Sequence, residues 1–112
     1  MDSKQTIAAL AALAQGTRLE AFRLLVRHEP TGLPAGDIAR LLDVPQNTMS
    51  AHLAVLARAG LVHGARASRS IIYRANLGRV RGLVSFLLED CCGQPDVCAP
   101  AVATLCGPEV KR

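Results

Sequence analysis

Residues 37–75 carry the pattern that most constrains the fold of this chain. Apolar spacing predicts a short helix over 37–42 and a second helix over 46–59, separated by a turn that contains a proline. Gly60 follows, and a glycine there can adopt the left-handed backbone conformation that ends a helix. The run 61–75 has β-prone residues at both ends and Gly, Ala, Ser and Arg between them, which predicts a hairpin with a basic tip. Two helices, a tight turn and a basic hairpin are typical of a winged helix-turn-helix.

The flanking segments predict further helices around this unit. A first helix is expected over 4–14, with an apolar stripe of Ile7, Leu10, Ala11 and Ala14. A second helix is expected to be capped by Thr17, and 29–36 reads as a loop. A long apolar stripe over 77–88 predicts a last helix, which Gly93 is expected to end. The predicted fold is therefore mainly α with a two-stranded β-wing.

Length and charge fit one domain with an anionic partner. The chain has 112 residues and a net charge of +4, which suits a polyanion. No apolar run reaches the ~20 residues of a membrane helix, and the alanine-rich run 7–14 after Asp2 is a poor signal peptide. We therefore expect a cytoplasmic protein. We do not expect an enzyme, because the chain has no phosphate-binding loop, no βαβ pattern and no basic residue next to its cysteines.

The helix over 46–58 has one apolar face and one polar face that is free of acidic residues. Met49, Leu53 and Leu56 share a face at ~100° per residue, so they are expected in the core. A solvated helix face would mix Glu and Lys, whereas short polar residues and alanines suit a helix that enters a major groove. The residues of this helix expected to contact DNA are Gln46, Asn47, Thr48, Ser50, His52 and Arg58.

The hairpin adds positive charge beside that helix. Arg66 and Arg69 flank its tip and are expected to contact phosphates or the minor groove. From Arg40 to Arg81 there are seven arginines and one acidic residue. The expected partner is therefore double-stranded DNA.

Three stretches are similar to the arsenical-resistance repressor (ArsR) family: "TRLEAFRLL" at 17–25, "GDIARLLDVPQNTMSAHLAVLARAGLV" at 36–62 and "RSIIYRA" at 69–75. The resemblance implies a homodimeric repressor that contacts its partner subunit through the first and last helices and leaves operator DNA when a toxic ion binds. Many relatives carry a cysteine box at the start of the helix-turn-helix. Here Pro34 and Gly36 stand where those cysteines would be, so an ion must bind elsewhere.

All four cysteines lie in the last part of the chain, at Cys91, Cys92, Cys98 and Cys106. In a reducing compartment such a cluster indicates metal or redox chemistry. A disulfide between the two adjacent cysteines has poor geometry, because neighbouring Cα atoms are only ~3.8 Å apart. The spacing also lacks the paired C-x2-C motifs of zinc ribbons. A disulfide between Cys92 and Cys98, a structural zinc ion and an incidental cluster remain alternatives.

We expect Cys91, Cys92 and Cys98 to bind As(III) as three thiolates, with the role of Cys106 open. Soft ligands select soft centres. The helix end and the neighbouring acids, Glu89 and Asp90, disfavour ionised thiolates. That penalises divalent cations, whereas arsenous acid and three thiols release only water.

The resemblance agrees with this site, since some family members bind arsenite through cysteines at the end of the last helix. It implies a domain over 1–92 that binds DNA and dimerises, and a tail over 93–112 that completes the inducer site with Cys98. No permanent cofactor is expected. Sb(III) or methylarsenite are further candidate inducers, and the alternatives are a Zn-, Cd- or Hg-sensing repressor and a thiol redox switch.

Overall fold

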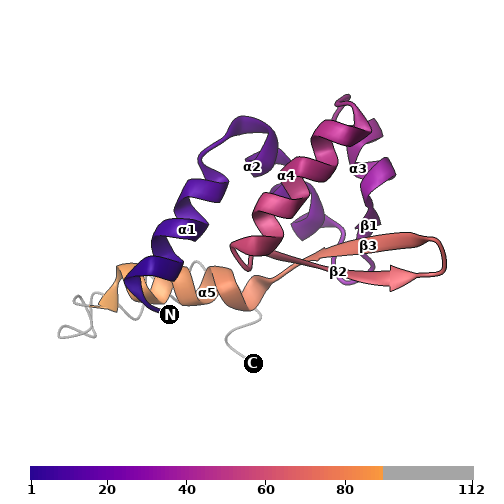
Figure 1. Cartoon of the computed structure of the whole chain (residues 1–112). Helices are drawn as coiled ribbons and strands as arrows, with labels where there is room; N and C mark the ends of the chain where they lie inside the picture. Colours follow the sequence, from indigo (N-terminus) through magenta and orange to yellow (C-terminus); the bar gives the residue numbers. More distant parts are fainter. Residues whose placement is uncertain (90–112) are drawn as a thin grey trace.

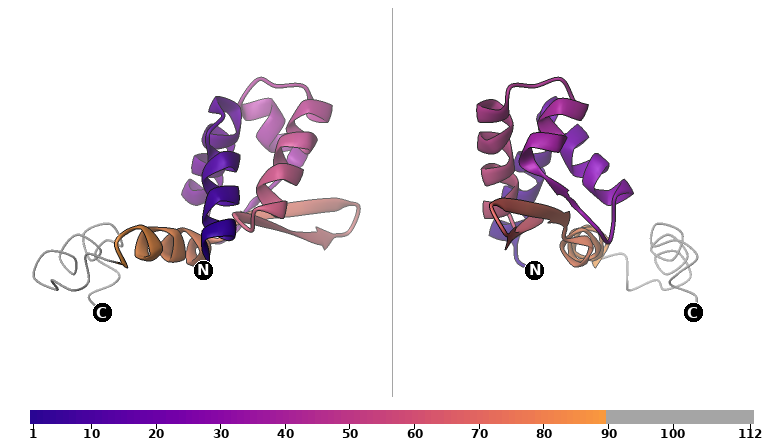
Figure 2. Two further views of the ribbon diagram at one scale, coloured as in Figure 1. Left: turned by 60° about the vertical axis from the view of Figure 1, so that its left-hand side comes forward. Right: turned by 90° about the vertical axis from the view of Figure 1, so that its right-hand side faces the viewer.

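A computed structural model describes residues 1–89 of the chain. Five helices and three strands alternate along it, with the bounds α1 (Ser3–Leu13), α2 (Gly16–Arg27), β1 (Leu33–Pro34), α3 (Ala35–Leu41), α4 (Gln46–Arg58), β2 (Val62–Ala67), β3 (Ser70–Ala75) and α5 (Leu77–Leu87). Helices α1 to α4 form one cluster, and the β2–β3 hairpin and α5 extend from it in opposite directions (Figures 1 and 2). The predicted winged helix-turn-helix is confirmed.

The core lies where α2, α3 and α4 meet the base of the hairpin. Its largest fully buried side chains are aliphatic or Met: Leu25, Ile38, Met49, Leu53, Leu56 and Leu61. The three core positions predicted on α4 are therefore confirmed. Their burial leaves the opposite face of the same helix directed toward solvent, because side chains three and four residues apart share one face of a helix.

The wing contains a third strand that the sequence did not predict. Leu33 pairs with Tyr73 and Pro34 with Ile72, which gives the antiparallel order β1-β3-β2. Residues 29–36 are thus not wholly a loop. Gly32 makes this approach possible, because its φ is +77° and a Cβ there would lie 2.5 Å from the carbonyl oxygen of Tyr73.

The first two helices differ from the prediction in their faces and ends. Helix α1 buries Thr6, Ala9 and Ala12, whereas Ile7 and Leu10 of its predicted apolar stripe are 66% and 44% exposed. The predicted cap of the second helix is wrong. Its N-cap is Gln15, whose side-chain oxygen accepts from the backbone N–H of Arg18, so the helix begins before Thr17.

Helix α5 begins at a side-chain cap and ends earlier than predicted. The side chain of Asn76 accepts a hydrogen bond from the backbone N–H of Arg79, and the helix ends at Leu87. Cys91, Cys92 and Gly93 therefore follow the end of α5 in the chain, and the predicted end at Gly93 is wrong. Within residues 1–89, none of the helices combines the length and the apolar character needed to span a membrane.

Candidate nucleic-acid interface

Helix α4 presents the polar face that the sequence predicted. Gln46, Asn47, Thr48 and Ser50 are all exposed near its first turn. Its N-cap is Pro45, and no side chain caps the helix there. The first backbone N–H groups of a helix lack intrahelical partners and carry partial positive charge. This end of α4 therefore combines exposed polar side chains with backbone donors suited to phosphate oxygens.

A hollow of about 260 Å³ joins the start of α4 to the wing. Gln46 and Ser50 of α4 line it together with Arg69 at the hairpin tip. Gly36 also lines it, next to the side chain of Gln46, whose Oε1 lies 3.6 Å from the position that a Cβ at Gly36 would take. Three of the predicted DNA-contacting residues are therefore brought together, although they are far apart in sequence.

The arginines at the wing tip form no ion pairs with other described residues. Arg66 lies on β2 and Arg69 in the turn, and both are exposed. By contrast, Arg74 binds Glu29 at 2.7 Å and Arg40 binds Asp37 at 2.9 Å. The positive charges of Arg74 and Arg40 are thus offset within the fold, whereas no described acidic side chain offsets those of Arg66 and Arg69.

Arg74 also anchors the wing to the segment after α2. The hydrogen bond from its guanidinium to Glu29, together with the charge of that carboxylate, raises the pKa of Arg74. The second carboxylate oxygen of Glu29 is buried without a hydrogen-bond partner among the described residues. The ion pair therefore holds β3 to the segment that follows α2.

Two predicted residues lie apart from this group. Arg58 is at the far end of α4, about 18 Å from Gln46 along the helix axis, where it lines a separate hollow of about 260 Å³ against α1. His52 is half-buried, and its Nδ1 lies 3.4 Å from Nη1 of Arg18 on α2. Arg18 was missed in the sequence because its partner is 34 residues away, and helical periodicity carries no signal for such a contact.

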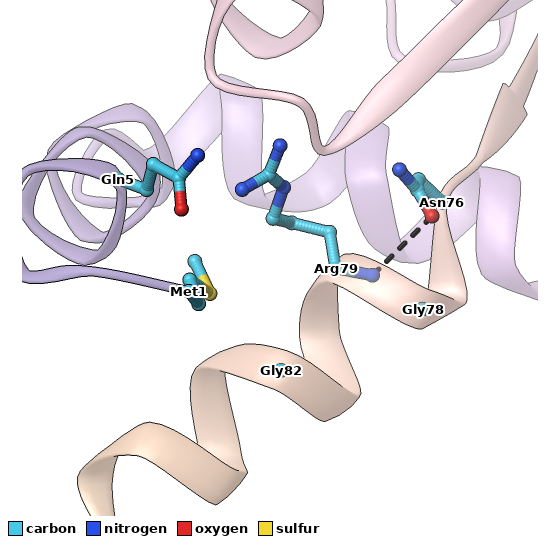
Figure 3. A pocket seen from close by; sticks show the side chains of 6 residues that line it. All are labelled: Met1, Gln5, Asn76, Gly78, Arg79 and Gly82. Carbon is cyan, nitrogen blue, oxygen red and sulfur yellow. Dashed lines mark hydrogen bonds between the residues drawn. The ribbon is translucent and has the colours of Figure 1, made fainter.

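A third hollow, of about 350 Å³, lies between α1 and the start of α5 (Figure 3). Gln5 and Arg79 face it from the two helices, and the glycines 78 and 82 leave its floor open. Its lining has neither thiols nor carboxylates. Residues 1–89 also hold no group of three or more side chains able to bind a metal ion. The predicted inducer site at Cys91, Cys92 and Cys98, with Cys106, lies outside the described residues.

Comparison with known proteins agrees with this geometry. A family model described as a helix-turn-helix domain matches residues 13–65. The structure of an ArsR-like transcriptional regulator from Rhodococcus sp. RHA1 superposes with a TM-score of 0.70 and 26% identity, over 91% of this chain and 92% of that one. The chain has a winged helix-turn-helix fold and is similar to ArsR-like transcriptional regulators.

Other similar proteins differ in the function that their names give. The transcriptional activator HlyU of Vibrio cholerae is 28% identical over 77% of each chain. The regulator NmtR of Mycobacterium tuberculosis is 42% identical over 62% of this chain, which spans about half (55%) of its length. A crystal structure described as a "possible transcriptional regulator for arsenical resistance" has 28% identity and a TM-score of 0.59, over 71% of this chain and 83% of that one.

Proposed function

We propose that this protein is a homodimeric, arsenic-responsive repressor. It binds operator DNA through α4 and the wing and leaves DNA when As(III) binds Cys91, Cys92 and Cys98. Sb(III) or a methylated arsenical are alternative inducers of the same site. The observation that carries the proposal is the placement of the cysteines, since three of them follow closely on the end of α5 at Leu87.

The exposed apolar side chains of α1 and α5 support a homodimer. Ile7 and Leu10 are 66% and 44% exposed on α1, and Leu87 is 57% exposed on α5. Exposed apolar side chains on neighbouring elements are typical of an interface rather than of a solvated surface. A second copy that covers this face would bury Ile7 and Leu10, which a single subunit leaves exposed.

The path from the cysteines to DNA runs through α5. Asn76 caps the start of this helix and also donates a hydrogen bond to the carbonyl oxygen of Gly60, just after α4. A change at the dimer interface would therefore alter how the two α4 helices are spaced. They must lie about one helical turn of DNA apart, ~34 Å, to occupy successive major grooves. A coupling of ~1–3 kcal/mol is enough to release the operator.

The chemistry of the ligands supports As(III) over a divalent cation. Three thiols and As(OH)3 give As(SR)3 and three waters, so binding releases no net proton. A divalent cation must expel the thiol protons instead, beside the acidic side chain of Glu89. One similar structure is described as a possible regulator of arsenical resistance, which agrees with this choice of inducer.

Single cysteine variants test the proposal in a DNA-release assay. We expect Cys91→Ser, Cys92→Ser and Cys98→Ser to bind operator DNA as the unaltered protein does, and to stay bound when arsenite is added. Cys106→Ser, in the same part of the chain, shows whether the fourth cysteine also takes part in release. A variant at Cys91, Cys92 or Cys98 that still releases DNA at the normal arsenite concentration would remove that residue from the site.

A further inference from the structure

Arg18 connects three helices through its guanidinium group. Its Nε donates a 2.7 Å hydrogen bond to the carbonyl oxygen of Ala12 near the end of α1. Its Nη1 lies 3.4 Å from Nδ1 of His52 on α4. Both side chains are half-buried. One residue of α2 thus touches the helix that presents the exposed apolar stripe and the helix that faces DNA.

The chemistry of the two groups determines where the proton of His52 lies. A guanidinium has only donors, and it is protonated at every physiological pH. The Nδ1 atom that faces it must therefore be the acceptor. In a neutral imidazole one nitrogen accepts and the other donates, so a hydrogen bond between Arg18 and Nδ1 corresponds to the tautomer with the proton on Nε2.

The second ring nitrogen points away from Arg18, because the two nitrogens of an imidazole point in divergent directions. His52 lies between the buried Leu53 and the exposed Ala51 on the flank of α4. An Nε2–H on this flank is a hydrogen-bond donor beside the exposed polar face of α4. Phosphate oxygens are the acceptors that such a flanking donor meets when a helix lies in a major groove.

We propose that Arg18 is a positioning residue for DNA binding: it fixes His52 as the Nε2–H tautomer, and His52 donates that hydrogen to a DNA phosphate. This inference rests on DNA binding by the exposed face of α4. Because Arg18 also holds the Ala12 carbonyl, the donor on α4 is placed relative to α1. A shift of α1 in the dimer would then move a DNA contact directly.

Two substitutions of His52 separate the roles of its nitrogens. The amide nitrogen of a glutamine reaches about as far as Nε2, whereas that of an asparagine reaches only about as far as Nδ1. We expect His52→Asn to weaken operator binding about tenfold and His52→Gln by less than about threefold. Equal losses in the two variants would overturn the phosphate contact.

A double-mutant cycle tests the part played by Arg18. Arg18→Met keeps the length of the side chain and removes its donors. We expect it to weaken DNA binding about fivefold in the unaltered protein and by less than about twofold in the His52→Gln background, since no tautomer remains to be fixed there. The same loss in both backgrounds would overturn the positioning role.

The salt dependence distinguishes a neutral donor from a charged one. A cation that neutralises a phosphate contributes about 0.9 to the slope of log K against log salt. We expect His52→Asn to leave this slope unchanged, whereas Arg69→Ala, the control, lowers it. A lower slope for His52→Asn would mean that His52 binds as an imidazolium, which overturns the proposal.

Nitrogen-15 NMR of the free protein at pH 8 reads the tautomer without DNA. We expect the Nε2–H pattern at His52, and mixed tautomers at the exposed His63 on β2. A proton on Nδ1 of His52 overturns the proposal even if Arg18→Met does not fold. If the unaltered protein shows the Nε2–H tautomer but binds no DNA, the DNA contact fails while the pairing of Arg18 with His52 stands.

Discussion

The side-chain amide of Asn76 donates a hydrogen bond to the carbonyl oxygen of Gly60 at 2.9 Å. The backbone N–H of Asn76 also donates to the carbonyl oxygen of Leu61 at 2.8 Å, and its side chain caps α5. Asn76 thus joins the end of the DNA-facing helix to the start of the helix that leads to the cysteines.

Removing the hydrogen bonds of the Asn76 side chain should lower the free energy of unfolding. Asn76→Ala loses a helix cap, worth about 1 kcal/mol, and a hydrogen bond of similar value. We expect the free energy of unfolding, measured in urea, to fall by about 2 kcal/mol. Ser85→Ala, at an exposed site on the same helix, is the control and should change it by less than about 0.5 kcal/mol. Equal stability of the two variants would contradict the role given to Asn76.

The contact of Gly32 with β3 predicts a second stability difference. An alanine there would adopt a positive φ, and its Cβ would lie 2.5 Å from a backbone oxygen that cannot move aside. We expect Gly32→Ala to lower the free energy of unfolding by about 2–4 kcal/mol. At Gly16 a Cβ meets nothing within 4 Å, so Gly16→Ala should be neutral or slightly stabilising. Thermal unfolding of the pair checks this, and similar melting temperatures would count against the structure of the wing.

The exposed stripe of α1 predicts a variant that separates dimerisation from folding. Because Ile7 is 66% exposed in one subunit, Ile7→Asp should leave the subunit folded but place charge in the dimer interface. We expect a monomer in sedimentation velocity and loss of operator binding. Leu41→Asp is the matched control, since Leu41 is 56% exposed on α3, and it should remain dimeric. A dimeric Ile7→Asp protein would place the interface elsewhere.

The hairpin tip predicts a loss of affinity without a loss of specificity. Arg66→Ala and Arg69→Ala should weaken binding to operator and to unrelated DNA by similar factors, because phosphate contacts carry no sequence information. Gln46→Ala should cost about 1–3 kcal/mol at the operator and relax its sequence preference. Arg23→Ala, an exposed arginine on α2, is the control. Competition binding measures both the affinity and the sequence preference. A loss of sequence preference in Arg69→Ala would contradict the phosphate contact assigned to Arg69.

The sequence predicted the helix-turn-helix and wing well because their signals are local. The apolar spacing of Met49, Leu53 and Leu56 identifies the buried face of α4, and Gly60, with a φ of +80°, ends it as predicted. Gly, Ala, Ser and Arg between two β-prone stretches identify the hairpin. The polar face of α4 then follows from its buried face.

The features that the sequence did not predict depend on partners that are distant in the chain. A two-residue strand such as Leu33–Pro34 has no periodicity, and it exists only because β3 lies beside it. The contact between Arg18 and His52 is equally non-local. An apolar stripe such as that of Ile7 and Leu10 indicates burial, but the pattern does not say whether its own subunit or a second copy covers it.

Titration of the operator complex with thiophilic ions tests the proposed function most directly. Fluorescence anisotropy of labelled operator DNA follows release by As(III), Sb(III), methylarsenite, Zn(II), Cd(II) and Hg(II). We expect release at the lowest concentrations of As(III), Sb(III) or methylarsenite, and no such release from the Cys91→Ser, Cys92→Ser and Cys98→Ser proteins. Release by Zn(II), Cd(II) or Hg(II) at lower concentrations than by any arsenic or antimony species would contradict an arsenic-responsive repressor.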